Sequence, residues 1–212
     1  MKNLFNDLSN RIYCGFAIIL SLCLLIACDS DDAPSQESLL PPITMTGENT
    51  FGCLVGGKYF RPRDGRSTIN IDNKGLRIVQ TENENLEFHV YDRKSDRTGS
   101  LFIHLENLFV LNEGYYNVKT ATGLRGLDGP NHNYIYGRFW KNSEVGYQNY
   151  VSFENSGNVE VTNREFIPNE SNIYSGTFHV KLINFDDVTD TIQISRGRFD
   201  LEAFSSQQHN WD

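Results

Sequence analysis

Apolar and polar residues alternate with a period of two along most of the chain from Thr50 onward. Glycine, asparagine, aspartate and proline interrupt the alternation every few residues, as they do between short β-strands. No window keeps a helical period of 3.6 residues between helix caps over ten residues. The pattern therefore predicts a single antiparallel all-β domain of about ten short strands, a β-sandwich by preference and a β-barrel as the alternative. The expected strands are residues 50–55, 58–61, 76–81, 86–91, 100–106, 115–119, 134–140, 150–154, 158–162, 177–183 and 191–203.

The N-terminal segment has a different pattern. Lys2 and Arg11 precede a continuous apolar run, Ile12–Ala27, which is shorter than the roughly 20 residues of a membrane-spanning helix. A basic segment followed by such a run is typical of a secretory signal peptide, so we expect residues 1–27 to be removed. The alternative is an uncleaved membrane anchor.

The apolar run ends in the sequence LIAC at Cys28, which resembles the lipobox of bacterial lipoproteins. The resemblance implies that the chain is cut before Cys28 and that this residue carries acyl chains such as palmitate. Because two or more acyl chains hold a protein stably on a bilayer, the expected partner of Cys28 is the outer membrane.

The residues after Cys28 are acidic: Asp29, Ser30, Asp31 and Asp32. This run resembles the surface-export signal of lipoproteins in the Bacteroidetes, which implies a place on the cell surface. The alternative is a solvated acidic tether on the periplasmic face. The prolines and serines that follow predict an extended linker over residues 28–48, which leaves residues 49–212 as the all-β domain.

Composition narrows the class of protein. The chain has 19 Lys and Arg against 27 Asp and Glu, a formal net charge of −8, so it has no general attraction for nucleic acid. A hydrophobic content of 39% and an aromatic content of 12% exceed those of a disordered chain. Cys53 is the one cysteine that remains after lipidation of Cys28, and its alternation with Phe51 and Val55 predicts that it is buried.

Two segments resemble a known family. Residues 40–58 read LPPITMTGENTFGCLVGGK, and the closing segments read SGTF from Ser175 and DTIQISRGRFD from Asp190. They resemble the start and the end of a family of small Bacteroidetes lipoproteins of uncharacterised function. The resemblance implies an all-β envelope lipoprotein and brings no catalytic residues with it. Within the closing segment, Gly197 interrupts a strand pattern and predicts a β-bulge.

The common catalytic motifs are absent from the sequence. It has no HExxH, no GxSxG, no phosphate loop, no dinucleotide fingerprint and no CxxC pair after the signal peptide. We therefore expect a protein that is not an enzyme and that carries no cofactor.

Three weaker signals carry alternatives. If residues 86–91 and 100–106 form a hairpin, His89 and His104 come close enough to hold a metal with Glu87 or Glu106, although a solvated polar face is favoured. The turn with Asp186, Asp187 and Asp190 has oxygen ligands for Ca²⁺ but lacks the EF-hand spacing, so a solvated turn is favoured. The sequence DTI at Thr191 resembles an O-glycosylation site of Bacteroidetes envelope proteins.

The strongest binding signal is the aromatic segment of residues 134–150. Tyr134, Tyr136, Arg138 and Trp140 share one face of a strand, and Tyr150 follows. Aromatic rings beside guanidinium groups stack on sugars and bind their hydroxyl groups, so these residues are candidate ligand contacts. The alternative is that the rings fill the core.

These observations predict a lipid-anchored envelope protein on the cell surface. Its expected role is a non-catalytic binding module for a glycan or a protein ligand. The alternative is a structural or accessory protein in complex with another outer-membrane protein. A hydrolase would require a cleft with a perturbed carboxylate or histidine.

Overall fold

The computed structural model describes residues 34–66, 73–81, 84–94, 99–107, 112–123 and 130–212. The chain divides into two compact units, Met1–Ser35 and Gln36–Asp212, and nearly all described residues belong to the second. Cys28 and the acidic run Asp29–Asp32 lie outside the described residues. Within the described ranges, no helix has the length and apolar character needed to cross a bilayer.

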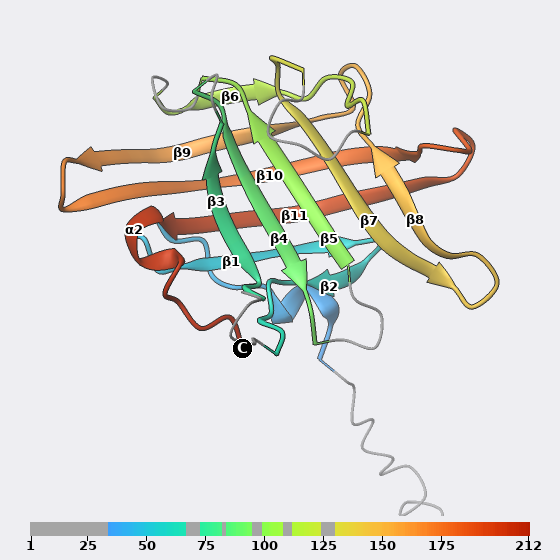
Figure 1. Ribbon diagram of the computed structural model, residues 1–212, viewed down its shortest axis with the longest axis horizontal. Coiled ribbons are helices and arrows are strands. Elements are labelled where there is room, and N and C mark those ends of the chain that lie inside the picture. Colours follow the sequence, from blue (N-terminus) through green and yellow to red (C-terminus); the bar gives the residue numbers. More distant parts are fainter. Residues whose placement is uncertain (1–33, 67–72, 82–83, 95–98, 108–111, 124–129) are drawn as a thin grey trace, which may run out of the picture. The chain divides into compact units, whose positions relative to one another are not determined.

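The second unit is built almost entirely of β-strands (Figure 1). In chain order its elements are η1 (Gln36–Leu39), β1 (Thr50–Val55), β2 (Lys58–Phe60), β3 (Leu76–Gln80), β4 (Leu86–Asp92), β5 (Gly99–Leu105), β6 (Gly114–Asn117), β7 (Tyr134–Asn142), β8 (Gly146–Val151), β9 (Gly157–Ile167), β10 (Ser171–Asn184), β11 (Thr191–Glu202) and α2 (Ala203–Ser206).

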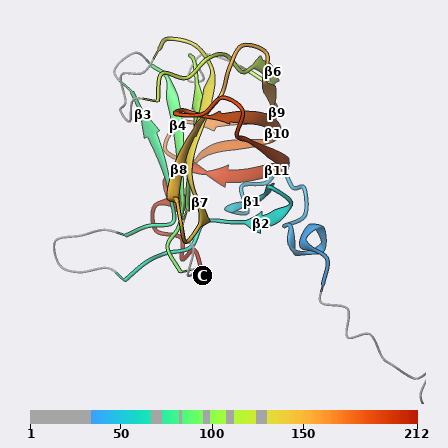
Figure 2. The same cartoon turned by 90° about the vertical axis from the view of Figure 1, so that its right-hand side faces the viewer.

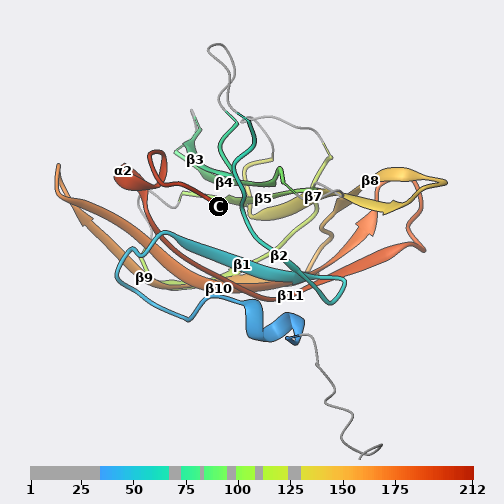
Figure 3. The same ribbon diagram turned by 90° about the horizontal axis from the view of Figure 1, so that it is seen from below.

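The strands form one antiparallel sheet that curls into two layers. The main hydrogen-bonded order is β2-β1-β11-β10-β8-β7-β5-β4-β3, with β9 on β10 and β6 on β9. We call β2, β1, β11, β10, β9 and β6 layer A, and β3, β4, β5, β7 and β8 layer B. The layers are continuous where the end of β10 pairs with β8 through Ile183 and Asn184. Figure 2 shows the layers side by side, and Figure 3 shows layer B above layer A.

This architecture confirms the predicted antiparallel all-β class. The sheet has the form of a half-barrel, because it turns one corner at β8 and ends at β2 and β3. Arg63, in the connection after β2, forms an isolated parallel bridge with Asp92 at the end of β4.

The space between the layers holds the main hydrophobic core. Phe88 of layer B packs against Tyr174 and Phe199 of layer A, with ring centroids 6.1 and 5.2 Å apart. Cys53 is fully buried in this core, as predicted, and burial raises the pKa of its thiol far above the ordinary value. The thiol is therefore an apolar packing group rather than a nucleophile.

The segment before β1 is bound to the sheet rather than extended as a linker. The carboxylate of Asp200 accepts hydrogen bonds from the backbone N–H groups of Thr46, Gly47 and Glu48 at 2.8 to 3.1 Å. The predicted linker of residues 28–48 is thus too long at its C-terminal end, because the compact unit begins at Gln36. Since β1 also pairs with β11, the two segments that carried the family resemblance are structural partners.

Glycine is required at two places in the sheet. Gly56 and Gly57 both have positive φ, 56° and 78°, which allows the tight turn between β1 and β2. The predicted bulge is present in β11, where the register against β10 shifts between Phe178 and Val180. A Cβ on Gly197 would lie 2.5 Å from the Phe178 ring, so only glycine fits there.

Candidate functional site

The candidate site lies on the outer face of layer B. Alternation along β4, β5 and β7 turns Phe88, Ile103 and Ile135 into the core, and their sequence neighbours face outward. The outward face is unusually aromatic for a face that does not contact the other layer. Phe102 and Tyr136 belong to a second buried cluster there.

Aromatic rings from neighbouring strands form the floor. Phe102 of β5 and Tyr136 of β7 are direct cross-strand partners, and their rings stack with centroids 4.6 Å apart and an interplanar angle of 5°. Tyr91 of β4 meets the Phe102 ring edge-on at 5.5 Å and 88°. Rings packed in this way are held rigidly, so the floor is formed before any ligand binds.

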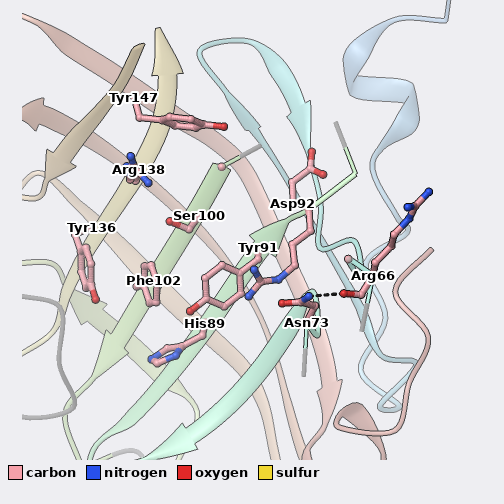
Figure 4. Close-up of a pocket in the computed structure, with 13 residues that line it drawn as sticks. Arg66, Asn73, His89, Tyr91, Asp92, Ser100, Phe102, Tyr136, Arg138 and Tyr147 are labelled. Carbon is pink, nitrogen blue, oxygen red and sulfur yellow. Dashed lines mark hydrogen bonds between the residues drawn. The ribbon is translucent and has the colours of Figure 1, made fainter. Parts of the chain in front are cut away.

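An open groove of about 750 Å³ lies above this floor. Its lining comes from layer B and from the connection between β2 and β3 (Figure 4). The lining residues are Gly65, Arg66, Asn73, His89, Tyr91, Asp92, Arg93, Gly99, Ser100, Phe102, Tyr136, Arg138 and Tyr147. A groove of this volume is large enough for a small organic ligand or a few sugar units.

Two guanidinium groups stand over aromatic rings of the groove. Arg138 lies over the Tyr147 ring at 4.4 Å from its centroid, and Arg93 lies over the Tyr91 ring at 4.1 Å. Arg93 also donates from Nε to the carbonyl of Lys74 at 3.2 Å. Cation–π contact and this hydrogen bond fix the planes of the guanidinium groups and leave other N–H groups to bind a ligand.

A buried polar network adjoins the groove at His89. Glu87 accepts hydrogen bonds from His104 Nδ1 at 2.8 Å, from His89 Nε2 at 2.6 Å and from the Tyr134 hydroxyl at 3.1 Å. The His104 ring stacks on the Tyr134 ring at 4.3 Å. Burial raises the pKa of Glu87, but the bonds from His104 and His89 outweigh it and lower that pKa to about 2. Glu87 is thus an ionised acceptor near neutral pH.

The sequence-predicted contacts divide into two groups. Tyr136 and Arg138 line the groove, whereas Tyr134 is buried in the Glu87 network. Trp140 lies half-buried beside the groove, in edge contact with Tyr147 at 5.2 Å. The prediction for Tyr150 requires correction.

Tyr150 lies on the inner face of β8 and is not part of the groove. Its ring packs near Phe139 in the main core, and its hydroxyl donates to Asp190 at 3.0 Å. Burial, followed by this contact with Asp190, raises the pKa of Tyr150 to about 12. The prediction placed the strand at residues 150–154, whereas β8 begins at Gly146. Along β8 the side chains alternate, so Tyr147 faces outward and Tyr150 faces inward.

Several groove residues were not predicted from the sequence. Phe102 and Tyr91 were detectable, since each is an aromatic residue on the polar side of its strand pattern. Arg66 and Asn73 come from an irregular connection, for which periodicity gives no signal. Arg93 follows the end of β4 and was hidden for the same reason.

The two predicted metal candidates have other partners. The predicted hairpin of β4 and β5 does form, but both histidines bind the same carboxylate, Glu87. Glu106 is not part of this network; its backbone N–H donates to the Asn133 side chain. Within the described ranges, no group of three or more His, Cys, Asp or Glu side chains has the arrangement of a metal site.

The acidic turn after β10 is held together by its own hydrogen bonds. Asp190 accepts from Lys141 at 2.8 Å and from Asn184 and Tyr150 at 3.0 Å. Burial raises the pKa of Asp190, but these contacts prevail and lower it below its ordinary value. The carboxylate therefore serves to position the turn.

Comparison with known proteins gives no assignment. No protein-family model matches the chain, and no curated protein or solved structure shows detectable similarity to it. The function therefore has to be argued from the groove itself.

Proposed function

We propose that the protein is a lipid-anchored lipoprotein of the outer membrane that faces the cell surface and binds a glycan in the groove without transforming it. The lining of the groove is the observation that carries the proposal. Aromatic rings, guanidinium groups, an amide and a hydroxyl converge there from four strands and one connection. A saccharide can contact both the aromatic rings and the polar groups, because it has apolar C–H faces as well as hydroxyl groups.

The chemistry of a sugar ring matches this lining. The C–H faces of a pyranose pack on aromatic rings, and Tyr91 and Tyr147 are half-buried, so part of each ring remains accessible. Hydroxyl groups of a sugar accept from guanidinium and amide donors such as Arg138 and Asn73. The groove is open to solvent, which suits a sugar that belongs to a longer chain.

The lining supports binding without hydrolysis. A glycoside hydrolase of the usual kind needs two carboxyl groups on either side of the scissile bond. Asp92 is the one carboxylate among the described lining residues, and Arg63 binds it with two hydrogen bonds of 2.6 and 2.8 Å. Glu87 lies under the groove with a pKa lowered to about 2, below any useful range for a general acid.

Location is proposed from the N-terminal sequence. The signal peptide, Cys28 and the acidic run Asp29–Asp32 stand in the order that lipoprotein export requires. Acyl chains at Cys28 would hold the protein on the membrane without a spanning segment.

A glycan array probed with the full-length protein in detergent tests the proposal. We expect selective capture of saccharides and about tenfold weaker capture by Tyr147→Ala, because this change removes one wall ring and the support of Arg138. Tyr115→Ala is the matched control, since Tyr115 is 72% exposed and lies on β6 of layer A. Equal capture by Tyr147→Ala and the wild type, or no capture at all, would overturn the proposal.

A further inference from the structure

We infer that the glycan is acidic and that the groove recognises its sulfate or carboxylate groups through Arg66, Arg93 and Arg138. This inference rests on the proposed function and names the chemical class of the ligand. Its basis is the charge of the lining, which is opposite in sign to the charge of the whole chain.

The described lining residues of the groove include three guanidinium groups and one carboxylate. The carboxylate of Asp92 is already neutralised by Arg63, with Nε and Nη2 donating at 2.8 and 2.6 Å, and it also accepts from the Lys94 backbone N–H. Among the described residues, no carboxylate forms an ion pair with Arg66, Arg93 or Arg138. Within the part of the chain that the structure describes, the guanidinium groups of the lining therefore outnumber its carboxylates.

This charge is notable in a chain with a formal net charge of −8. Like charges in one groove repel each other. The chain has more acidic than basic residues, so a shortage of carboxylates does not explain the positive charge of this lining. Among the described residues, these three guanidinium groups have no carboxylate partner, and an anion bound between them would relieve their mutual repulsion. An acidic ligand would supply that partner.

The geometry of the arginines suits anionic groups that present two oxygen atoms side by side. The rings of Tyr147 and Tyr91 hold Arg138 and Arg93 from one side, so their N–H edges are pre-oriented. A guanidinium in a fixed plane binds a carboxylate or sulfate with two parallel hydrogen bonds and loses little entropy. In Figure 4, Arg138 and Arg66 lie toward opposite ends of the labelled side chains, which fits several charges spaced along a polymer.

Phosphorylated or acidic proteins also carry anions, but the aromatic floor favours a saccharide. Phe102, Tyr136 and Tyr91 present a continuous apolar base between the arginines. A polymer of acidic sugars places an apolar ring face between successive charges, and a poly-glutamate chain does not.

Binding assays with matched polymers test the inference. We would measure the affinity of the full-length protein in detergent for dextran, carboxymethyl-dextran and dextran sulfate, and for neutral, uronate-bearing and sulfated oligosaccharides on an array. Poly-glutamate serves as the acidic polymer without sugars. We expect acidic saccharides to bind at least tenfold more tightly than their neutral counterparts, and a preference between the two acidic forms to identify the anionic group.

Arginine variants assign the effect to the groove. Arg138→Gln and Arg93→Gln should each weaken binding of the acidic saccharide at least tenfold, because each removes a charge-assisted bidentate contact. Arg196→Gln is the matched control, since Arg196 lies on β11 of layer A, its side chain is 62% exposed and it forms an ion pair of 3.4 Å with Glu37 of η1. Thermal unfolding of Arg138→Gln should match the wild type, because Arg138 is exposed. Arg93→Gln also loses the hydrogen bond to the carbonyl of Lys74, so its binding is measured well below its own unfolding temperature.

The possible outcomes separate this inference from the proposed function. Equal binding of neutral and acidic saccharides, with sensitivity to Tyr147→Ala but not to Arg138→Gln, would overturn the inference and leave the glycan-binding function in place. Binding of poly-glutamate in preference to every saccharide would overturn both. Absence of binding to any of these polymers would also overturn both.

Discussion

At the scale of single residues, Glu87 is the most informative side chain of layer B. Its carboxylate is 1% exposed and therefore depends on its three hydrogen-bond donors, His89, His104 and Tyr134. A buried charge with such partners stabilises a fold only while all partners are present. The network thus holds the outward-facing side chains of β4 and β5 in place and orients His89 at the edge of the groove.

Glu87 predicts a specific dependence of stability on pH. Its pKa is about 2 in the folded protein against an ordinary value of 4.5, so the unfolded chain takes up the proton first. The contribution of Glu87 is complete above pH 4.5 and is lost as the pH falls toward 2. The shift corresponds to roughly 3 kcal/mol.

Glu87→Gln should therefore lower the free energy of unfolding at pH 7 by roughly 3 kcal/mol, and the difference from the wild type should shrink as the pH falls from 4.5 toward 2. Urea unfolding followed by circular dichroism at several pH values measures this. Glu154→Gln, at an exposed position, is the control. A difference that stays constant with pH would contradict the account.

The aromatic face of β7 could be predicted from the sequence only in part. The shared face of Tyr134, Tyr136 and Arg138 follows from strand alternation and could be predicted. Whether a ring on that face lines a groove or lies beneath a loop depends on what covers the strand. Tyr134 is 1% exposed because it packs into the Glu87 network, and no local pattern encodes that.

At the scale of secondary structure, the strands were well predicted where apolar residues alternate. The central strands β1, β4 and β5 begin and end within one residue of the expected positions. The hairpin of β9 and β10 is much longer than predicted, Gly157–Ile167 and Ser171–Asn184. The added part of β10 is mostly buried and pairs with β11, but Asn172, Ser175 and Gly176 interrupt its apolar pattern. The added part of β9 is half-buried or exposed and pairs with β10 at an edge. Such edge pairing depends on backbone hydrogen bonds rather than on side-chain pattern.

The contact between the N-terminal segment and β11 gives a second prediction. Asp200 accepts hydrogen bonds from three backbone N–H groups of residues 46–48 and from the Ser175 hydroxyl at 2.7 Å. Burial raises the pKa of Asp200, but these bonds prevail and lower it. The carboxylate thus fastens the start of the compact unit to its last strand.

Asp200→Ala should lower the free energy of unfolding by about 2 to 4 kcal/mol, because hydrogen bonds to a charged acceptor are lost and their donors remain unpaired. It should also expose residues 40–48 to proteolysis. Thermal unfolding and limited digestion with proteinase K, which does not require a basic residue, measure the two effects, with Asp186→Ala, at an exposed position, as the control. A variant with wild-type stability would show that the segment is held by other contacts.

At the scale of the whole molecule, the curled sheet separates two tasks. The space between the layers holds the main core, whereas the outer face of layer B carries the groove. The all-β class and the burial of Cys53 followed from composition and alternation. The groove could not be predicted in this way, because its residues meet only once β4, β5, β7 and β8 have paired in register and the connection before β3 lies beside them.

We propose above all that this protein presents a glycan-binding groove at the cell surface. Retention of a fluorescent acidic saccharide by intact cells tests it most directly. Cells would carry the wild type, the groove variant Arg138→Gln combined with Tyr147→Ala, or the control Arg196→Gln combined with Tyr115→Ala, at equal protein amounts. Each set would be measured before and after treatment with proteinase K.

We predict that wild-type and control cells retain the saccharide, that proteinase K abolishes this retention, and that cells with the groove variant retain at most a tenth as much. Equal retention by the groove variant would contradict the role of the groove. Protection of the protein from proteinase K until the outer membrane is opened would contradict the surface location.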